Sequence, residues 1–534
     1  MSVVNRALAL LFAVMTAMQI SPEKIENRMK YLASDLMEGR ETGTRGYDAA
    51  AVYVATQFRE AGAFAEYQTV PLKTATLDAK ASTLSIDGTP LTYGTDFLLR
   101  GDPMNATLDA SAPVVFAGFG VVAPELKHDD YSKLDASGKI VAMLSGAPSS
   151  FPHDQRAYYS SAEVKRKAAA DHGAIAIITI PTITDAKRGP WEKRVPQSLM
   201  PSMIALDPDG KPLDAQPALR GNATLNREAA AKLFAHAPMT LERVLEDAEK
   251  HVAHSFALGA TASIHTVSTV GTTESQNVIG LVLGTDIKLR NQTVVVTAHL
   301  DHLGNHPPAN GGDGIYNGAL DNASGVACLI EMCRAQVKAP QKRSIAFVAV
   351  TGEEKGLLGS EFYTRYPTMP REGILANINM DMFTMLFPVA DVVLLGAEHS
   401  SLGPLAARAA KESGFSVSPD PLPEEVRFIR SDQYSFVRAG IPAITMKGGE
   451  KSRDAKIDGA GVLKAWLHDV YHTPKDDMSQ HFDYASAARF AEANLKLARM
   501  IAESNERPQW KKGDFFGERF AASKRKATIT VKTP

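Results

Sequence analysis

The pattern of apolar and polar positions divides the chain into three stretches. In the first, Ile25, Met29 and Leu32 have the spacing of one face of a helix. A second helix is expected from about Tyr47 to Ala61, with Gly62 as its stop signal. These helices carry no cluster of reactive side chains, so we expect them to be structural.

The middle stretch, residues 73–265, alternates short apolar runs with turn residues. Strands are expected at 114–120, 139–144 and 174–180, and a helix from about 162 to 172 precedes the last of these. Ionisable residues are scattered along this stretch rather than concentrated. We therefore expect a small α/β or β-rich module without a catalytic centre.

The third stretch, residues 266–504, alternates strands with helices. Val294 to Ala298 and Ile345 to Val350 are nearly continuous apolar runs rich in β-branched residues, typical of strands covered on both faces of a parallel sheet. The alternation predicts a doubly wound, mostly parallel sheet with helices on both faces. Ligands bind at the carboxyl ends of the strands in such sheets. Polar residues that follow these runs are therefore the candidates for a functional site.

The two ends of the chain have different sequence patterns. In residues 1–19, Arg6 precedes the apolar run Ala7 to Met18, which is typical of a secretory signal and too short to span a bilayer. A buried first helix is the alternative. No other stretch is long enough for a transmembrane helix, so we expect an exported protein, periplasmic or extracellular. Residues 505–534 form a C-terminal tail that contains the short basic cluster Lys524-Arg525-Lys526.

The net charge and the cysteine content limit the classes of protein to which the chain can belong. The formal net charge is −2 over 534 residues, which gives no electrostatic footprint for nucleic acid or for an anionic membrane surface. The two cysteines, Cys328 and Cys333, lie five apart on one expected helix. Their Cα atoms would be roughly 8 Å apart, beyond the reach of a disulfide. We expect both to be small buried side chains.

The first candidate ligands follow the run that ends at Ala298. His299 comes directly after it, and Asp301 is placed to supply the carboxylate or carbonyl that fixes the tautomer of a ligating imidazole. Asp321 follows a glycine-rich loop and precedes a helix. It can cap that helix, or it can bridge two cations because each oxygen can bind one. Taken alone, each of these residues also has an ordinary structural interpretation.

Further candidates follow later strands and a turn. Glu353 and Glu354 end the second run, where neighbouring carboxylates repel unless cations or protons offset them. Adjacent residues point in different directions, so one acid can bind metal while the other faces a substrate water. Two solvated acids at a helix start are the alternative. Asp381 ends the strand from Ile374, and His472 lies on a turn. Together these residues suffice for two metals with one bridging carboxylate and one spare acid.

Taken in order, the segments that carry these residues resemble the motifs of the M28 family of zinc metallopeptidases, particularly its secreted bacterial aminopeptidases with a protease-associated domain. The resemblance implies a zinc-exopeptidase fold in which residues 20–72 and 266–504 form the catalytic domain and residues 73–265 an inserted, β-rich protease-associated domain. The matching motifs are Ala298–Gly304, Asn317–Gly325, Gly352–Ser360, Asn379–Asp381 and Tyr471–Pro474.

The resemblance also implies two Zn²⁺ per chain and a role for each ligand. Asp321 would bridge the two ions. His299 and Asp381 would complete one site, and Glu354 and His472 the other. Glu353 would be the general base, and Asp301 would support catalysis from behind His299. Arg430, Asp432 and Tyr434 would line the substrate side.

Two positions depart from the family pattern. Gln433 stands where the family commonly has histidine, and Phe428 stands where some members have an oxyanion-stabilising tyrosine. A phenyl ring cannot donate a hydrogen bond. The hydroxyl of Tyr434, or the zinc alone, would have to take over that role.

The leading hypothesis is an exopeptidase that removes N-terminal residues from peptides. Arginines suit a terminal carboxylate, so Arg427, Arg430 and Arg438 leave a carboxypeptidase or dipeptidase open. A glutaminyl-cyclase-like transferase with one zinc and a non-catalytic, receptor-like protein also remain open. A receptor-like protein is expected to lose ligands, and none of the five is missing. We expect peptide substrates, no nucleic acid and no stable membrane span, and we leave the oligomeric state open.

Overall fold

In a computed structural model of the chain, residues 20–188, 190–306 and 311–521 are described. The expected signal of residues 1–19 and the basic cluster Lys524-Arg525-Lys526 lie outside the described residues. The chain divides into two compact units. One ends at Val70 and resumes at Glu274, and the other runs from Pro71 to Thr273.

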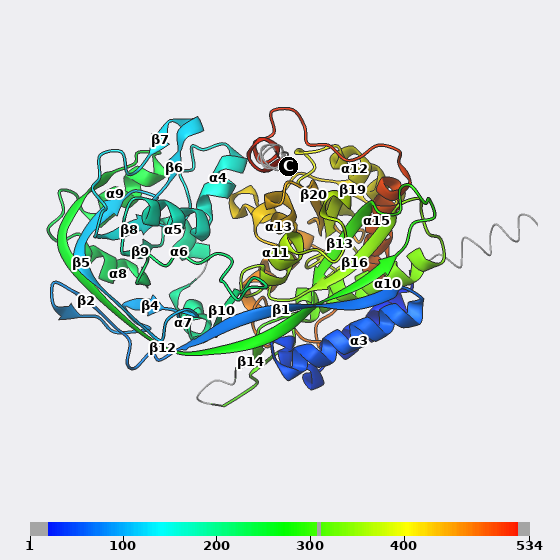
Figure 1. Cartoon of the computed structure of the whole chain (residues 1–534), viewed down its shortest axis with the longest axis horizontal. Helices are drawn as coiled ribbons and strands as arrows, with labels where there is room; N and C mark the ends of the chain where they lie inside the picture. The colour runs from blue at the N-terminus through cyan, green and yellow to red at the C-terminus, as the bar shows by residue number, and fades with distance from the viewer. Residues whose placement is uncertain (1–19, 189, 307–310, 522–534) are drawn as a thin grey trace, which may run out of the picture. The chain divides into compact units, whose positions relative to one another are not determined.

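The first unit is built around a sheet with the strand order β19-β18-β20-β17-β13-β16-β12 (Figure 1). Strand β13 pairs in parallel with β16 and β17, and β17 pairs in parallel with β20. Towards the edges, antiparallel pairs form between β12 and β16 and between β18 and β20. The predicted mostly parallel sheet is therefore confirmed. The strands are β12 (Ser255–Val282), β13 (Thr293–His299), β16 (Ser344–Val350), β17 (Ile374–Asn379), β18 (Asp391–Leu395), β19 (Ser416–Val417) and β20 (Ala443–Gly448).

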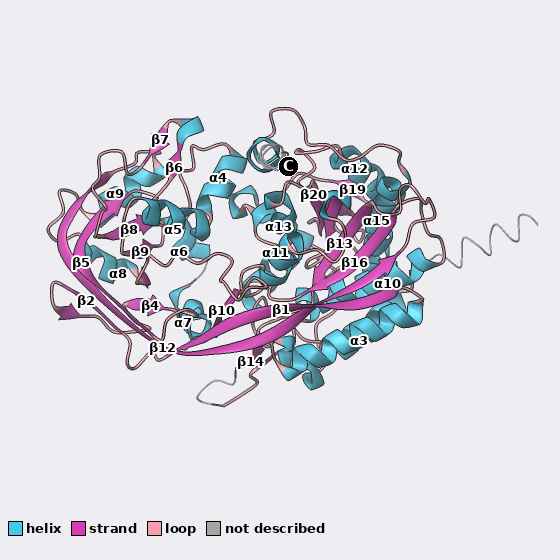
Figure 2. Cartoon of the chain, in the orientation of Figure 1, coloured by secondary structure: helices cyan, strands magenta, loops and turns pink. Residues whose placement is uncertain are grey.

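Helices of this unit cover the sheet in two groups (Figure 2). Helices α10 and α15 pack on each other and on β13 and β16, while α11 and α13 pack on each other and α13 contacts β17 and β20. All seven residues of β13 are buried, which explains why the strand is mostly apolar. The helices are α2 (Pro22–Leu32), α3 (Arg45–Ala61), α10 (Ser324–Val337), α11 (Leu358–Arg365), α12 (Leu402–Glu412), α13 (Gln433–Arg438), α14 (Gly459–Asp469) and α15 (Tyr484–Glu503).

The two N-terminal helices form where the sequence predicts them. Helix α2 begins after Ser21, whose side chain accepts the backbone N–H of Lys24 at 3.3 Å. Its three apolar face residues are completely buried in the core of the first unit. Helix α3 ends at Gly62, whose φ of 94° is readily adopted only by glycine.

The second unit has its own hydrophobic core, and its strands pair in the order β12-β5-β8-β9-β11-β4. The strands expected at 114–120, 139–144 and 174–180 overlap β5, β8 and β9, although β5 begins earlier and ends at Ala117, and the expected helix is α5. That the second unit is a protease-associated domain stays a prediction. The main elements are β1 (Phe64–Leu77), β2 (Thr83–Ile86), β3 (Thr89–Pro90), β4 (Phe97–Leu99), β5 (Thr107–Ala117), β8 (Ile140–Leu144), β9 (Ala176–Ile180), β10 (Ser202–Ala205), β11 (Asn222–Leu225), α4 (His153–Ser160), α5 (Ala162–Asp171), α6 (Ile183–Arg188), α7 (Trp191–Leu199), α8 (Arg227–Leu233) and α9 (Leu241–Glu249).

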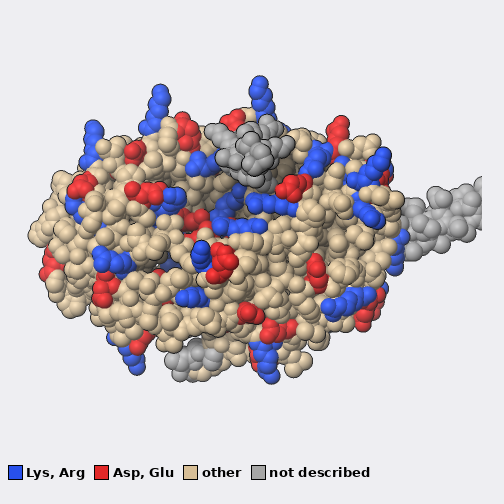
Figure 3. All heavy atoms as spheres, viewed as in Figure 1, with Lys and Arg blue, Asp and Glu red and all other residues tan. Residues whose placement is uncertain are grey.

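Several smaller expectations can be compared with the structure. Cys328 and Cys333 are both buried and free, as predicted. The segment expected as a C-terminal tail packs on the first unit as far as it is described, because Phe516 is completely buried against Phe428 and Trp510 donates to the carbonyl of Gly440 at 3.1 Å. Among the described helices, none is long and apolar enough to cross a membrane. Acidic and basic side chains are both scattered over the face drawn in Figure 3.

Candidate metal centre

The carboxyl ends of three neighbouring parallel strands bring the first candidate residues together. His299 ends β13 and is paired with Val350, the last residue of β16, from which the chain continues to Glu353. Thr297 is paired with Asn379, the last residue of β17, two residues before Asp381. Because the strands run in parallel, these ends lie at one edge of the sheet.

One group of ligand atoms surrounds the imidazole of His299. Its Nε2 lies 3.2 Å from Oδ1 of Asp321 and 3.7 Å from Oδ1 of Asp381. Its Nδ1 lies 3.1 Å from the backbone carbonyl oxygen of Asp301, an acceptor that places the ring hydrogen on Nδ1. With the ring hydrogen on Nδ1, the Nε2 atom that faces the two carboxylates would be available to bind a metal.

A second group lies on the other side of Asp321. The Nε2 of His472 is 3.1 Å from Oδ2 of Asp321 and 3.4 Å from Oε2 of Glu354. The Nδ1 of His302 is 2.8 Å from Oε1 of Glu354. The two oxygens of Asp321 therefore face two different sets of ligand atoms, which is the arrangement of a bridging carboxylate.

The donor atoms fit metal ions in chemistry and in spacing. Among the described residues, His299, Asp321 and Asp381 offer ligand atoms within 4.8 Å of one another, and so do His302, Asp321 and Glu354. Buried carboxylates and imidazoles at such distances are the ligands that zinc prefers. Without cations, so many buried acids would repel one another.

The acids of the site differ in their protonation. Burial favours the neutral form of Glu354, but the charge of His472 and the hydrogen bonds of His302 and His472 together outweigh it and lower the pKa of Glu354 to about 2. Burial raises the pKa of Glu353 well above its usual range, and the charges of Glu354 and Asp381 add to that effect. Glu354 is thus prepared to bind a cation as an anion, whereas Glu353 has the higher proton affinity of the two.

Asp301 has two separate contacts. The tautomer of His299 is fixed by the backbone carbonyl of Asp301, not by its carboxylate. The carboxylate instead accepts the backbone N–H of Glu353 at 3.1 Å and that of Glu354 at 3.2 Å, together with the hydroxyl of Thr42 at 3.2 Å. Asp301 therefore orients both His299 and the pair of glutamates.

Asp476 supports the loop of Asp321 and has no assigned role from the sequence. Its Oδ1 accepts the backbone N–H of Leu320 at 2.9 Å, and its Oδ2 accepts that of Asp321 at 3.0 Å. Burial raises the pKa of Asp476 to about 6. The only sequence signal is its position four residues after His472, on the same turn. The contacts join that turn to the Asp321 loop.

Arg40 is a second supporting residue without a sequence signal. Its guanidinium is completely buried and donates only to backbone carbonyls among the hydrogen bonds of the described residues. Burial lowers its pKa to about 10, and nearby acids such as Asp476 and Asp301 oppose the shift. Arg40 therefore stays charged at neutral pH and joins the segments that carry His299 and Asp321. The acceptors are Leu32, Leu300, Asn317 and Gly318, at 2.6, 2.9, 2.6 and 3.0 Å.

The three residues expected on the substrate side lie in different environments. The side chain of Arg430 is 53% exposed and pairs with Glu425 at 2.7 Å. Asp432 is completely buried, and burial raises its pKa to about 7. Tyr434 is buried, and the Cζ of Arg438 lies 5.7 Å from the centre of its ring. Of the three, only Arg430 has a largely open side chain.

Gln433, at the position of the family's histidine, has a structural role. Its Nε2 donates to the carbonyl of Phe428 at 2.7 Å, and its Oε1 accepts Nδ2 of Asn379 at 2.8 Å. Asn379 also accepts the hydroxyl of Thr297 at 2.7 Å. Gln433 therefore ties α13 to the strand ends of β17 and β13.

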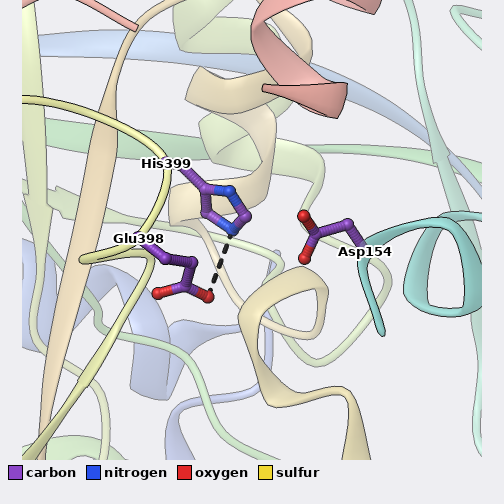
Figure 4. Close-up of side chains that lie close together, drawn as sticks. All are labelled: Asp154, Glu398 and His399. Carbon is purple, nitrogen blue, oxygen red and sulfur yellow. Dashed lines mark ion pairs between the residues drawn. The ribbon is translucent and has the colours of Figure 1, made fainter. Parts of the chain in front are cut away.

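His399 forms a separate buried histidine–acid group in the same unit. Its Nδ1 lies 2.7 Å from Oδ2 of Asp514, and its Nε2 lies 3.4 Å from Oε1 of Glu398, the ion pair drawn in Figure 4. The centres of the His399 and Phe428 rings are 4.7 Å apart. These contacts hold the C-terminal segment against Phe428, which indicates a structural role.

The match to a protein family covers the segment that carries these ligands. Residues 277–498 match peptidase family M28. Aminopeptidase YwaD of Bacillus subtilis is 29% identical over 224 residues, which cover 40% of this chain and 44% of the relative. The alkaline phosphatase isozyme conversion protein of Escherichia coli is 32% identical over 223 residues, which cover 37% of this chain and 62% of the relative. The chain thus spans about half the length of these curated relatives.

A solved structure extends the likeness to the fold of nearly the whole chain. The aminopeptidase from Aneurinibacillus sp. strain AM-1 aligns with a TM-score of 0.56 at 19% sequence identity, over 91% of this chain and 95% of that chain. At this identity the likeness concerns the fold. The match to peptidase family M28 itself concerns residues 277–498.

Proposed function

We propose that the protein is a two-zinc exopeptidase that removes N-terminal residues from peptides. The observation that carries the proposal is the placement of Asp321 between two sets of buried ligand atoms. Its Oδ1 faces His299 and its Oδ2 faces His472. The family match supports peptide hydrolysis, and the names of YwaD and the Aneurinibacillus protein favour action at the N-terminus.

The five expected ligands divide naturally between two zinc ions. His299, Asp381 and one oxygen of Asp321 would hold the first. Glu354, His472 and the other oxygen of Asp321 would hold the second. Three protein ligands for each ion leave positions open for water and substrate, as in catalytic zinc sites.

Glu353 is the residue that moves the proton. Bound zinc lowers the pKa of water and polarises a scissile carbonyl. Glu353 belongs to neither set of ligands, and its backbone is fixed by Asp301. Its raised pKa suits a group that takes a proton from water and returns it to the departing amine. With Phe428 in the family's tyrosine position, Tyr434 is the candidate donor to the oxyanion.

A peptide-library digest read by mass spectrometry tests the proposal, because it shows which end is trimmed. We expect N-terminal trimming that stops when the zinc is chelated. Glu353→Gln should lower kcat about 10²–10⁴-fold while zinc analysis still finds two ions. Glu23→Gln, at an exposed position of α2, serves as the matched control.

Different results would favour a competing function. Trimming from the C-terminus would indicate a carboxypeptidase, and cyclisation of glutaminyl peptides by a one-zinc protein would indicate the transferase. A zinc-loaded protein that leaves every peptide intact would favour the receptor-like hypothesis. Full activity of Glu353→Gln would refute the proposed general base.

A further inference from the structure

We propose that His302 is a positioning residue of the second metal group, which donates its Nδ1–H to Oε1 of Glu354 and so leaves only Oε2 for the metal. This inference rests on the proposed two-zinc site. None of the ligand roles implied by the family resemblance includes His302. It lies three residues after His299, directly beyond the end of β13.

The two oxygens of Glu354 have different neighbours. Oε1 lies 2.8 Å from Nδ1 of His302, which is a normal hydrogen-bond distance. Oε2 lies 3.4 Å from Nε2 of His472. One oxygen is thus taken by a hydrogen bond, and the other faces the expected ligand on the metal side. A carboxylate divided in this way binds a cation through one oxygen rather than two.

The ring of His302 has little freedom to turn away from Glu354. Its side chain is completely buried, and its backbone N–H donates to the carbonyl of Arg40 at 3.2 Å. A Cβ at Gly318 would lie 2.6 Å from Cγ and Cδ2 of the ring. The ring therefore packs directly on the backbone of Gly318, in space that a larger residue would fill.

The geometry favours a positioning role over direct ligation. The Nδ1 of His302 lies 3.9 Å from the nearer oxygen of Asp321, whereas Nε2 of His472 lies 3.1 Å from that oxygen. His472 thus sits between the two acids, where a shared cation belongs. His302 contacts the other oxygen of Glu354, Oε1. Hydrogen bonds to ligating carboxylates typically contribute 10–100-fold to metal affinity.

Zinc affinity measured by competition with a chromophoric chelator tests the inference without any assay of activity. The wild-type chain should bind two zinc ions. His302→Ala should weaken one of them about 10–100-fold and leave the other unchanged. His302→Asn should restore the affinity, because its amide N–H can take the place of Nδ1–H. His302→Gln, whose amide extends towards the position of Nε2, should not restore it. His468→Ala, on the exposed face of α14, is the control.

The pair of amide variants keeps the test decisive if the alanine variant fails to fold. Equal zinc affinities for His302→Asn and His302→Gln would overturn the inference. The inference would also be overturned if neither His302→Ala nor His302→Asn bound a second zinc at any zinc concentration, because that result identifies His302 as a direct ligand. A wild-type chain that binds a single zinc would overturn the proposed two-zinc function, and this inference with it.

Discussion

The carboxylate of Asp301 holds the backbone of Glu353, with 3.1 Å between Oδ1 and the amide nitrogen. Its other oxygen holds the next amide, that of Glu354, at 3.2 Å. One buried carboxylate therefore fixes both the proposed base and a proposed ligand. Its backbone carbonyl meanwhile fixes the tautomer of His299.

Asp301→Asn should disturb the contacts of the side chain with the two glutamate amides and leave the backbone contact with His299 intact. The amide keeps one acceptor oxygen and adds a donor, so one of the two glutamate N–H groups loses its partner. The contact to His299 persists because it uses the backbone. We expect zinc affinity and kcat to fall about 10–100-fold, as measured by chelator competition and peptide hydrolysis. Asp286→Asn, in a surface turn, is the control. An Asp301→Asn chain with wild-type affinity and rate would contradict the role given to this carboxylate.

Arg40→Met should destabilise the first unit. It leaves four buried carbonyls without their donor, and each unsatisfied group costs about 1–3 kcal/mol. We expect the free energy of unfolding, measured with urea, to fall by at least about 3 kcal/mol. Arg40→Lys should not restore it, because an ammonium lacks the planar fork that reaches several acceptors.

The exposed Arg45, which pairs with Glu38, provides the matched control. Arg45→Met should leave the free energy of unfolding unchanged. If Arg40→Lys is as stable as the wild type, the charge of Arg40 matters and its geometry does not.

The strand ends of the site could be predicted because their signal is local. The runs of β13 and β16 are almost entirely apolar, with Thr297 as the one polar residue inside them, and all residues of both strands are buried. Polar residues directly after such runs are placed by the topology alone. His472 follows no strand, so the topology does not place it, and its assignment to the same ion as Glu354 came only from the resemblance to a family.

The supporting residues could not be predicted because their partners are backbone atoms. The acceptors of Arg40 lie between 8 and 278 residues away along the chain. Asp476 accepts amides of the Asp321 loop about 155 residues away. No pattern of side chains records such contacts. His302 stands inside a recognised motif, yet only its distance to Glu354 indicates a role.

Zinc should stabilise the folded chain. The buried acids around Asp321 repel one another without cations, and a ligand that binds only the folded state adds about 2.7 kcal/mol at 100 times its Kd. We expect thermal unfolding to shift upward with zinc and far less with magnesium. Asp321→Asn should remove most of the shift, because this residue serves both groups. A zinc-dependent shift of wild-type size in Asp321→Asn would place the binding elsewhere.

Lys165 should give the second unit a distinctive dependence on pH. Its side chain is buried on α5 and donates to the carbonyls of Leu144 at 2.5 Å and Gly146 at 2.9 Å. Burial lowers its pKa from 10.5 to about 7. Between these values the folded state carries the neutral amine and the unfolded state the ammonium. The unfolded state then binds more protons, so the free energy of unfolding rises with pH. Below about pH 7 both states are charged, and the cost of burying the charge is fully present.

The contribution of Lys165 should amount to about 1.4 kcal/mol per pH unit within this window. Urea unfolding of wild type and Lys165→Met from pH 6 to pH 10 checks it, because the difference between the two curves cancels the titration of other groups. The wild type should gain on the variant as pH rises above about 7. Lys167→Met, at an exposed position of the same helix, should run parallel to the wild type. A constant difference between wild type and Lys165→Met would show that Lys165 has the same pKa in both states.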